Sequence, residues 1–215
     1  MDPARFRLLT IDSRGHGRSE GEPSTFSFAR FNADIRAAID AAQIRSATVV
    51  GFSGGSKDAV WLAAESPDMV RALVLVAPPG LGVVPMPKEV MWPFFDELTR
   101  DKKVSAVFEP WLTEKLGHYR DEVLRDYANT PLPVLRAAAE LWLYTSVEEH
   151  ARRVTQPMLV VAGAREPLGN AAYQRQTTLV SCPHAQLVML DCGHWIPFEE
   201  PAALADLIGT FSQPA

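Results

Sequence analysis

Short runs of apolar residues, nearly free of polar interruptions, recur along the chain and predict the strands of a buried sheet. A strand covered on one face alternates apolar and polar side chains, whereas continuous runs rich in Val, Leu and Ile are typical of parallel strands covered on both faces. Five segments have the continuous pattern, at residues 6–11, 47–50, 72–76, 158–162 and 187–190.

Helical periodicity fills the stretches between several of these runs. Apolar residues recur at three- and four-residue spacing over residues 31–42, which is the repeat of an amphipathic helix. A second helix is predicted after Ser53 and should end near Ser66-Pro67, because a residue that precedes proline disfavours helical backbone. Strands that alternate with helices predict an α/β fold, a mostly parallel sheet with helices on both faces and right-handed crossovers.

The alternation stops between residues 78 and 155, where no run predicts a strand. This stretch opens with Pro78-Pro79-Gly80, a loop signal, and continues as helix-like segments rich in aromatic residues. We predict a core part at residues 1–79, a helical cap at 80–155 over the carboxyl edge of the sheet, and a second core part at 156–215. Most aromatic residues of the cap are expected to form its own core, while Trp92 and Phe95 are predicted to line an apolar substrate pocket.

A candidate nucleophile stands where a predicted strand gives way to a helix. The sequence Gly51-Phe52-Ser53-Gly54-Gly55 fits the nucleophile elbow Gly-x-Ser-x-Gly, whose sharp turn requires small residues beside the serine. Ser53 would then lie at a helix amino terminus, where free N–H groups and the dipole favour developing negative charge. A glycine turn or a phosphate-binding loop is the alternative, but the residues that a P-loop or a dinucleotide fingerprint needs are missing.

A serine nucleophile needs a base and an orienting carboxylate. His194 follows the last predicted strand, which places it on the same carboxyl edge as Ser53, where α/β sheets keep their sites. Glu166 follows the strand predicted at 158–162 and reaches the same edge. The order serine, acid, histidine is the one expected for this elbow. Asp191 lies close to His194 in sequence, but we interpret it as structural because it caps a strand.

Four motifs, spread over nearly the whole chain, resemble the α/β-hydrolase superfamily in its esterase and cofactor-free haloperoxidase-like branch. They are Asp12-Ser13-Arg14-Gly15-His16-Gly17-Arg18-Ser19, the elbow at residues 51–55, Gly163 to Glu166, and Gly193-His194 followed by Phe198-Glu199-Glu200-Pro201. The acid turn carries Glu where the family pattern Gly-x-x-Asp carries Asp. A serine nucleophile argues against the dehalogenase relatives, which use Asp.

The resemblance implies a Ser53–His194–Glu166 triad and an acyl-enzyme route without a cofactor or a metal. Ser53 would attack a carbonyl, His194 would take and return the proton, and Glu166 would hold the imidazole. Phe52 and Trp195, which adjoin the nucleophile and the base in sequence, are expected to bind substrate. A small-molecule acyl compound is therefore the expected partner.

The resemblance also shows what this chain leaves out. In the family, two edge strands, a third strand in the middle of the sheet and a His-Gly loop precede the Asp-x-x-Gly-His-Gly motif, whereas this chain begins at what resembles the fourth strand. The N–H of Gly54 would remain as one oxyanion-hole donor, and the second is missing from its usual place, a loss of about 10²–10³ in rate.

Three accounts of the short start are open. Met1 is internal to a longer native protein, or the chain is a truncated and impaired enzyme. In the third account, the strand at residues 6–11 pairs beside 47–50 and brings a backbone N–H from residues 14–17 to Ser53.

The charge and the residue content of the chain indicate which classes of binding partner to expect. The chain has 215 residues and a formal net charge of −5, which does not favour nucleic acid or anionic membranes, and it has no apolar stretch of membrane-spanning length and no signal-peptide core. Cys182 and Cys192 are too few for a disulfide scaffold and lack zinc spacing, so we expect reduced thiols in a cytoplasmic protein. An exposed sheet edge would favour a homo-oligomer.

Three function classes fit these residues. The leading prediction is a serine hydrolase of carboxylic esters or related acyl substrates. Acyl transfer or perhydrolysis would use the same triad, because they differ only in the nucleophile that reaches the acyl-enzyme. A catalytically impaired or non-catalytic small-molecule-binding protein would keep the fold and the pocket, since a fold does not fix a function.

Overall fold

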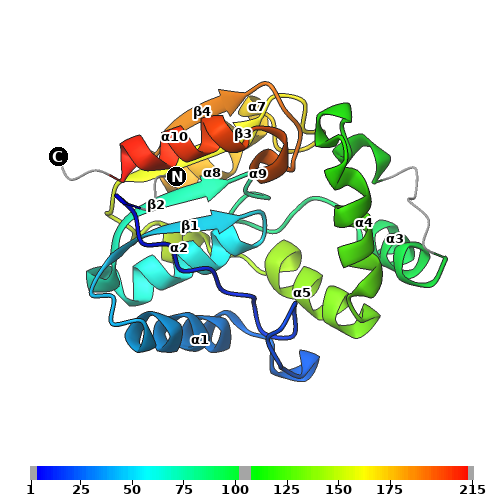
Figure 1. The fold of residues 1–215 in the computed structure, drawn as a ribbon, viewed down its shortest axis with the longest axis horizontal. Helices are drawn as coiled ribbons and strands as arrows, with labels where there is room; N and C mark the ends of the chain where they lie inside the picture. The colour runs from blue at the N-terminus through cyan, green and yellow to red at the C-terminus, as the bar shows by residue number, and fades with distance from the viewer. Residues whose placement is uncertain (1–3, 102–107, 213–215) are drawn as a thin grey trace.

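Four strands form one parallel sheet with helices packed around it (Figure 1). The computed structural model describes residues 4–101 and 108–212. The strands β1 (Ala47–Phe52), β2 (Val70–Val76), β3 (Met158–Gly163) and β4 (Gln186–Leu190) lie side by side in chain order. The predicted α/β class and its parallel sheet are confirmed, and four of the five predicted strands correspond to β1–β4.

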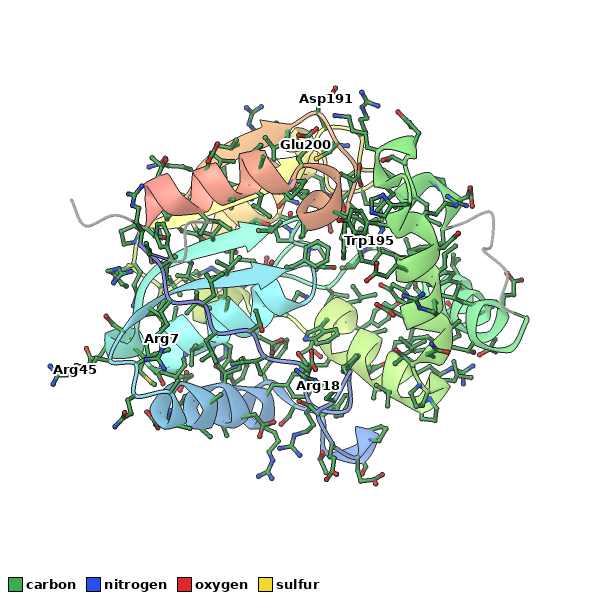
Figure 2. The ribbon with its side chains drawn as sticks, in the orientation of Figure 1. Arg7, Arg18, Arg45, Asp191, Trp195 and Glu200 are labelled. Carbon is green, nitrogen blue, oxygen red and sulfur yellow. The ribbon has the colours of Figure 1, made fainter. Side chains whose placement is uncertain are left out.

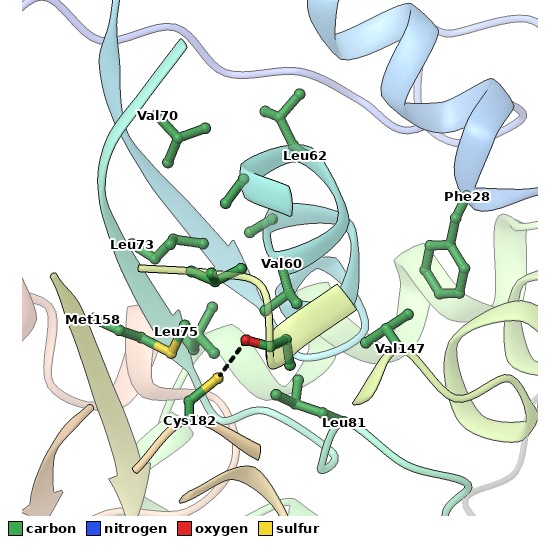
Figure 3. Close-up of a cluster of buried hydrophobic side chains, with 14 of the residues drawn as sticks. Phe28, Val60, Leu62, Val70, Leu73, Leu75, Leu81, Val147, Met158 and Cys182 are labelled. Atoms are coloured by element: carbon green, nitrogen blue, oxygen red, sulfur yellow. Dashed lines mark hydrogen bonds between the residues drawn. The ribbon is translucent and has the colours of Figure 1, made fainter. Parts of the chain in front are cut away.

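The apolar runs are continuous because both faces of the sheet are covered. In β2, Leu73 and Leu75 belong to the apolar cluster on one face, whereas Val74 and Val76 belong to the cluster on the other. Successive side chains of a strand point to opposite faces, so residues 72–76 of this strand are apolar on both faces and all buried, while Arg71 near its start is exposed. Figure 3 shows the first cluster, in which Leu73 and Leu75 of the strand and Val60 of the neighbouring helix are drawn.

Helices supply the other half of each cluster. The first cluster contains residues of α1 (Phe28–Ala41) and α2 (Gly55–Glu65), and the second contains residues of α10 (Pro201–Phe211). The helices predicted over 31–42 and after Ser53 correspond to α1 and α2. The remaining short elements of the two core parts are η1 (Pro23–Thr25), η2 (Pro67–Met69), α7 (Ala171–Gln176), α8 (Thr178–Ser181) and α9 (Ile196–Glu199).

Between β2 and β3 the described residues contain helices and turns but no strand. We call residues 80–155 the helical insertion, and its helices α3, α4 and α5 lie beyond the arrowheads of β1 and β2 (Figure 1). Phe94, Phe95, Leu98 and Leu135 are buried in an apolar cluster of its own. Its elements are α3 (Lys88–Asp96), the π-helix η3 (Glu97–Asp101), η4 (Glu109–Trp111), η5 (Glu114–Leu116), α4 (Tyr119–Asn129), α5 (Leu132–Tyr144) and α6 (Glu148–Ala151).

The two ends of the helical insertion meet at a neck beside α2. The fully buried Lys57 of α2 donates hydrogen bonds to the carbonyls of Gly82 (2.6 Å) and Thr145 (2.9 Å), one on each side of the neck. Burial lowers the pKa of Lys57 to about 8, because the ammonium loses solvation. Two backbone bonds of 2.8 Å also join the sides of the neck, from Val84 N to Leu143 O and from Val147 N to Leu81 O.

The prediction of a buried strand over residues 6–11 is wrong. Within the described residues this segment has no strand partner, and β1 pairs with β2 alone. Leu8, Leu9 and Ile11 are 65%, 43% and 40% exposed, and on β1 itself Val50 is 45% exposed. An extended run becomes a strand only where a neighbour supplies partners for its backbone groups. Residues 6–11 and β1 instead line one open cavity, so the pairing with 47–50 on which the third account depends is not found in the described structure.

Both cysteines are free and buried. The thiol of Cys182 lies 3.6 Å from the carbonyl oxygen of Ala151 (Figure 3). Burial raises the pKa of Cys182 to about 11 and that of Cys192 to about 12, so both thiols stay protonated at neutral pH. In the part of the chain that the structure describes, no helix has the length and apolar character needed to cross a membrane.

Candidate active site

Ser53 stands on a strained turn between β1 and α2. Its φ of +50° lies in the left-handed region, which a residue with a Cβ adopts at a cost and mainly at functional sites. Its backbone N–H donates to Val76 O at 2.8 Å, which ties the turn to the end of β2. The strand, the sharp turn and the helix follow one another as the elbow pattern predicts.

The glycines of the elbow have different roles. A Cβ at Gly51 would lie 2.5 Å from Gly55 O, and one at Gly54 would lie 2.6 Å from the Trp142 ring, so neither position has room for a side chain. A Cβ at Gly55 would meet nothing within 4 Å. Close packing therefore explains why residues 51 and 54 are glycines. At position 55 there is room for a side chain, so packing does not explain Gly55.

The three predicted catalytic residues are joined by two hydrogen bonds. His194 Nε2 lies 3.1 Å from Ser53 Oγ, and His194 Nδ1 lies 2.7 Å from Glu166 Oε1. The carboxylate can only accept, so Nδ1 carries the proton and Nε2 presents its lone pair to the serine hydroxyl. Side-chain exposure is 13% for His194 and 5% for Glu166, so the hydrogen bond between them is largely shielded from water.

The longer Glu side chain fits because a glycine lies beside it. A Cβ at Gly169 would come within 2.3 Å of Glu166 Oε2, so this oxygen occupies the place that a side chain at residue 169 would take. Oε2 is buried and has no hydrogen-bond partner among the described residues. Oε1 alone therefore anchors the carboxylate to His194.

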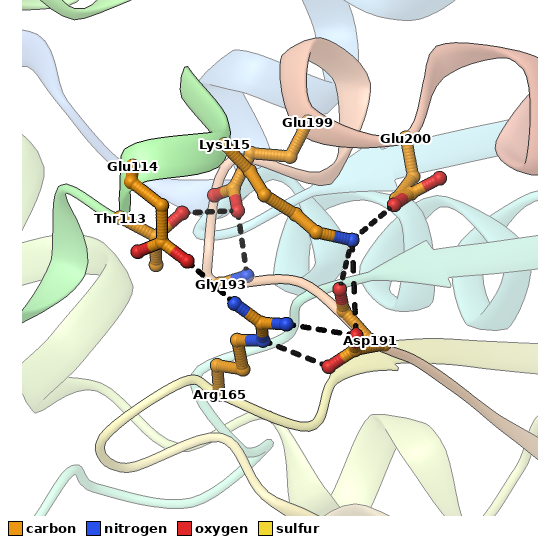
Figure 4. A network of polar contacts seen from close by, with 8 residues as sticks. All are labelled: Thr113, Glu114, Lys115, Arg165, Asp191, Gly193, Glu199 and Glu200. Carbon is orange, nitrogen blue, oxygen red and sulfur yellow. Dashed lines mark hydrogen bonds and ion pairs between the residues drawn. The ribbon is translucent and has the colours of Figure 1, made fainter. Parts of the chain in front are cut away.

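The turns that carry the acid and the base are bonded to each other. The backbone N–H of Arg165 donates to Cys192 O at 2.9 Å, and its guanidinium donates to both carboxylate oxygens of Asp191 at 2.8 Å (Figure 4). A third guanidinium N–H reaches Glu114 of the helical insertion at 2.6 Å. Asp191 thus contacts the acid turn from outside the triad.

An open cavity of about 1560 Å³ reaches the triad. Of the four predicted substrate-binding residues, Phe52, Phe95 and Trp195 line it, and Trp195 lies between the strand ends and α4 (Figure 2). Trp92 is not among the described residues that line the cavity, because its ring packs against Tyr144 at a centroid distance of 5.9 Å.

Several other residues that line the cavity could not be recognised from the sequence. Phe94, Tyr127, Leu135 and Trp142 line the cavity from α3, α4 and α5. Nothing in a helical apolar pattern distinguishes a residue that faces a cavity from one that faces the core. In the described ranges, no three His, Cys, Asp or Glu side chains gather closely enough to hold a metal ion.

One carboxyl of the cavity wall is buried without a full set of partners. Asp58 Oδ2 accepts a hydrogen bond of 2.9 Å from Trp142 Nε1, while Oδ1 has no partner among the described residues. Burial raises the pKa of Asp58 to about 7, although the Trp142 bond favours the charged form. The ring of His16 also lies beside Trp142, with the two centroids 5.5 Å apart, and burial lowers the pKa of His16.

The predicted oxyanion donor Gly54 is the N-cap residue of α2. The first N–H groups of a helix lack the usual intrahelical acceptors. Here Ser56 N donates to Ser53 O and Lys57 N to Gly54 O, which leaves the N–H of Gly54 as the candidate donor beside Ser53. Residues 14–17, the hypothetical source of a second donor, line the same cavity as Ser53. The N–H of His16 already donates to Ser13 O, which leaves Arg14, Gly15 and Gly17 as candidates.

Comparisons with known proteins identify the family. A sequence profile described as the alpha/beta hydrolase fold matches residues 1–201. The chain is 23% identical to 3-oxoadipate enol-lactonase 2 of Acinetobacter baylyi, over 93% of this chain and 76% of that protein. It is 28% identical to the 2-hydroxymuconate semialdehyde hydrolase of a Pseudomonas species, over 95% of this chain and 76% of that protein.

Solved structures agree on the fold. The crystal structure of the enol-lactonase from Burkholderia xenovorans superimposes with a TM-score of 0.79 at 22% identity, over 93% of this chain and 78% of the other. The profile match covers almost the whole chain, and the sequence relatives are named as hydrolysing enzymes. The chain therefore belongs to the α/β-hydrolase fold family and is a hydrolase.

Proposed function

We propose that this hydrolase cleaves carboxylic esters or related acyl compounds through an acyl-enzyme on Ser53. The observation that carries the proposal is the pair of hydrogen bonds Ser53–His194–Glu166, at 3.1 and 2.7 Å, with the serine on a strained elbow at a helix amino terminus. A nucleophile bonded to a base that is bonded to a buried carboxylate is the arrangement that activates serine.

The reaction runs in two halves. Ser53 Oγ attacks the acyl carbonyl carbon while His194 Nε2 takes the hydroxyl proton, and the N–H of Gly54 donates to the oxyanion of the tetrahedral intermediate. The intermediate collapses, the leaving alcohol departs with the proton from the imidazolium, and the acyl group stays on Ser53. Water then attacks the acyl-enzyme and gives a proton to His194. As this second tetrahedral intermediate collapses, His194 returns the proton to Ser53 Oγ, which releases the carboxylic acid and restores the serine hydroxyl. Glu166 holds the imidazole and stabilises its positive charge in both halves.

The cavity wall suggests the class of substrate. Phe52 and Trp195 lie against His194, with ring centroids 5.3 and 5.5 Å away, and Phe94 and Phe95 of the helical insertion line the same cavity. We propose that the insertion acts as a cap over an apolar acyl or alcohol group. One sequence relative is named as a lactonase, and a lactone is a cyclic carboxylic ester. Esters with an apolar ring or chain are therefore the first substrates to test.

A fluorophosphonate probe with intact-mass detection tests the proposal. The parent should gain one adduct, because phosphonylation needs a serine that a base activates, and Ser53→Ala should gain none. Ser24→Ala, which removes an exposed serine of η1, is the matched control and should react like the parent. Peptide mapping should place the adduct on Ser53. A parent that is folded by circular dichroism and gains no adduct would contradict the proposal and favour a non-catalytic binding protein.

A further inference from the structure

A buried carboxylate outside the triad holds the backbone on both sides of the proposed base. Glu199 is the last residue of α9 and is 8% exposed. Its Oε2 accepts a hydrogen bond of 2.7 Å from Gly193 N, and its Oε1 accepts one of 3.1 Å from Trp195 N. These are the two residues that flank His194, so the position of the imidazole depends on where this carboxylate lies.

The same carboxylate reaches the helical insertion. Thr113 Oγ1 donates a hydrogen bond of 2.5 Å to Glu199 Oε2, and Figure 4 shows Thr113 and Gly193 on two sides of the Glu199 side chain. The contact is tight, because a Cβ at Gly193 would lie 2.5 Å from Thr113 Cγ2 and 2.9 Å from Glu199 Oε1. We call residues 193–195, which carry His194, the base turn. Thr113 of the helical insertion therefore packs directly against the base turn.

The base turn also rests directly on the sheet. A Cβ at Gly163, the last residue of β3, would lie 2.1 Å from Gly193 O. The turn is thus enclosed between β3, Glu199 and Thr113. Local helix capping would account for the bond from Trp195 N, since Trp195 is the N-cap residue of α9. It does not account for the bonds from Gly193 and Thr113, which come from outside the helix.

We propose that Glu199 is a positioning residue for the hydrolase reaction, which fixes His194 through the two flanking N–H groups and couples it through Thr113 to the helical insertion. The inference rests on the proposed function. An ionised acceptor makes stronger hydrogen bonds than a neutral one, and three donors converge on this one. A Gln side chain cannot replace it, because its NH2 group would face one of the three donors.

Glu199→Gln is the test, with Glu200→Gln as the matched control. The neighbouring Glu200 loses the same charge, but its carboxylate is bonded to Lys115 at 2.6 Å and does not contact the base turn. We expect Glu199→Gln to react with the fluorophosphonate about 10- to 100-fold more slowly than the parent, since a shift of about 1 Å at a reacting group costs up to about 10² in rate. Glu200→Gln should react at the parent rate.

A proton NMR resonance of His194 distinguishes a positioning role of Glu199 from a role in stability alone. The Nδ1–H proton of His194, bonded to Glu166, should give a protected downfield resonance in the parent, assigned by its loss in His194→Gln. It should be shifted or lost in Glu199→Gln and kept in Glu200→Gln. If Glu199→Gln is folded and has the parent's rate and resonance, the inference is overturned.

Thr113 gives a second, milder variant for the case in which Glu199→Gln does not fold. Thr113→Val removes the donor from the insertion and should slow labelling, while Thr113→Ser keeps the hydroxyl and should restore the rate. A parent-like Thr113→Val would overturn the coupling to the insertion. If the parent itself is never labelled, the hydrolase proposal fails, and the Nδ1–H resonance in Glu199→Gln still decides whether Glu199 positions His194.

Discussion

Shortening the acid by one methylene tests whether Glu166 orients the base. In Glu166→Asp the carboxylate would retreat by about one C–C bond, about 1.5 Å, from the 2.7 Å that now separates Oε1 from His194 Nδ1. With an effective dielectric constant of 20, the attraction between the carboxylate and an imidazolium falls from about 6 kcal/mol at the present distance to about 4 kcal/mol at 4 Å. The difference of about 2 kcal/mol corresponds to a rate about 30-fold lower.

Removing the negative charge of Glu166 should lower the rate further than shortening the side chain does. Glu166→Gln keeps the size of the side chain but takes away the anion, and its amide can stabilise the wrong imidazole tautomer. The corresponding change in a serine protease triad lowers kcat about 10⁴-fold, and we expect a loss of that order here. The two variants should therefore rank parent, Asp, Gln in rate.

The rates would be measured as fluorophosphonate labelling and as hydrolysis of a p-nitrophenyl ester, at matched folded concentrations. Glu114→Asp is the control. It shortens an exposed carboxylate by the same methylene, and that carboxylate is bonded to Arg165, the neighbour of Glu166, but not to His194. A parent-like rate for Glu166→Asp, or an equal loss in Glu114→Asp, would refute the assignment of Glu166 as the orienting acid.

Two further variants probe the surroundings of the triad. Gly169→Ala would place a Cβ 2.3 Å from Glu166 Oε2, so the carboxylate must move from His194 and labelling should slow by about 10²-fold; an unchanged rate in a folded variant would show that the turn can yield. Asp58→Asn removes a carboxyl whose pKa is raised to about 7 by burial. Because folding favours the protonated acid, the parent should lose up to about 4 kcal/mol of unfolding free energy relative to Asp58→Asn between pH 4 and pH 7. Urea denaturation across this range measures the difference, and parallel stability curves for the two proteins would contradict the expectation.

The strands of the sheet could be predicted from the sequence where burial on both faces requires a continuous run of apolar residues. Residues 72–76 form a run without polar side chains because β2 is central and both of its faces are covered. Residues 6–11 are also mostly apolar, with Arg7 and Thr10 as the exceptions, yet the segment has no strand partner in the described structure. Composition reports what a segment can bury, whereas strand pairing depends on a neighbour that lies elsewhere in the chain.

The candidate triad was accessible to the sequence analysis because parallel strands bring their carboxyl ends to one edge. Ser53, Glu166 and His194 each follow a strand, so topology alone places them near one another. Glu199 and Asp58 carry no such signal. Their importance comes from contacts with Thr113 and Trp142, residues that are distant in sequence and lie in a part of the chain whose packing no local pattern specifies.

The chain enters and leaves the helical insertion at one place. Leu81 is bonded to Val147 and Val84 to Leu143, and Lys57 holds both sides from beneath. A short connector could span such a gap, and the free energy of closing a loop changes only with the logarithm of its length. A replacement for the insertion would therefore join the core at this neck, with Lys57 as its anchor, and it would have to supply the contacts that Thr113 now makes with Glu199 and Trp142 with Asp58.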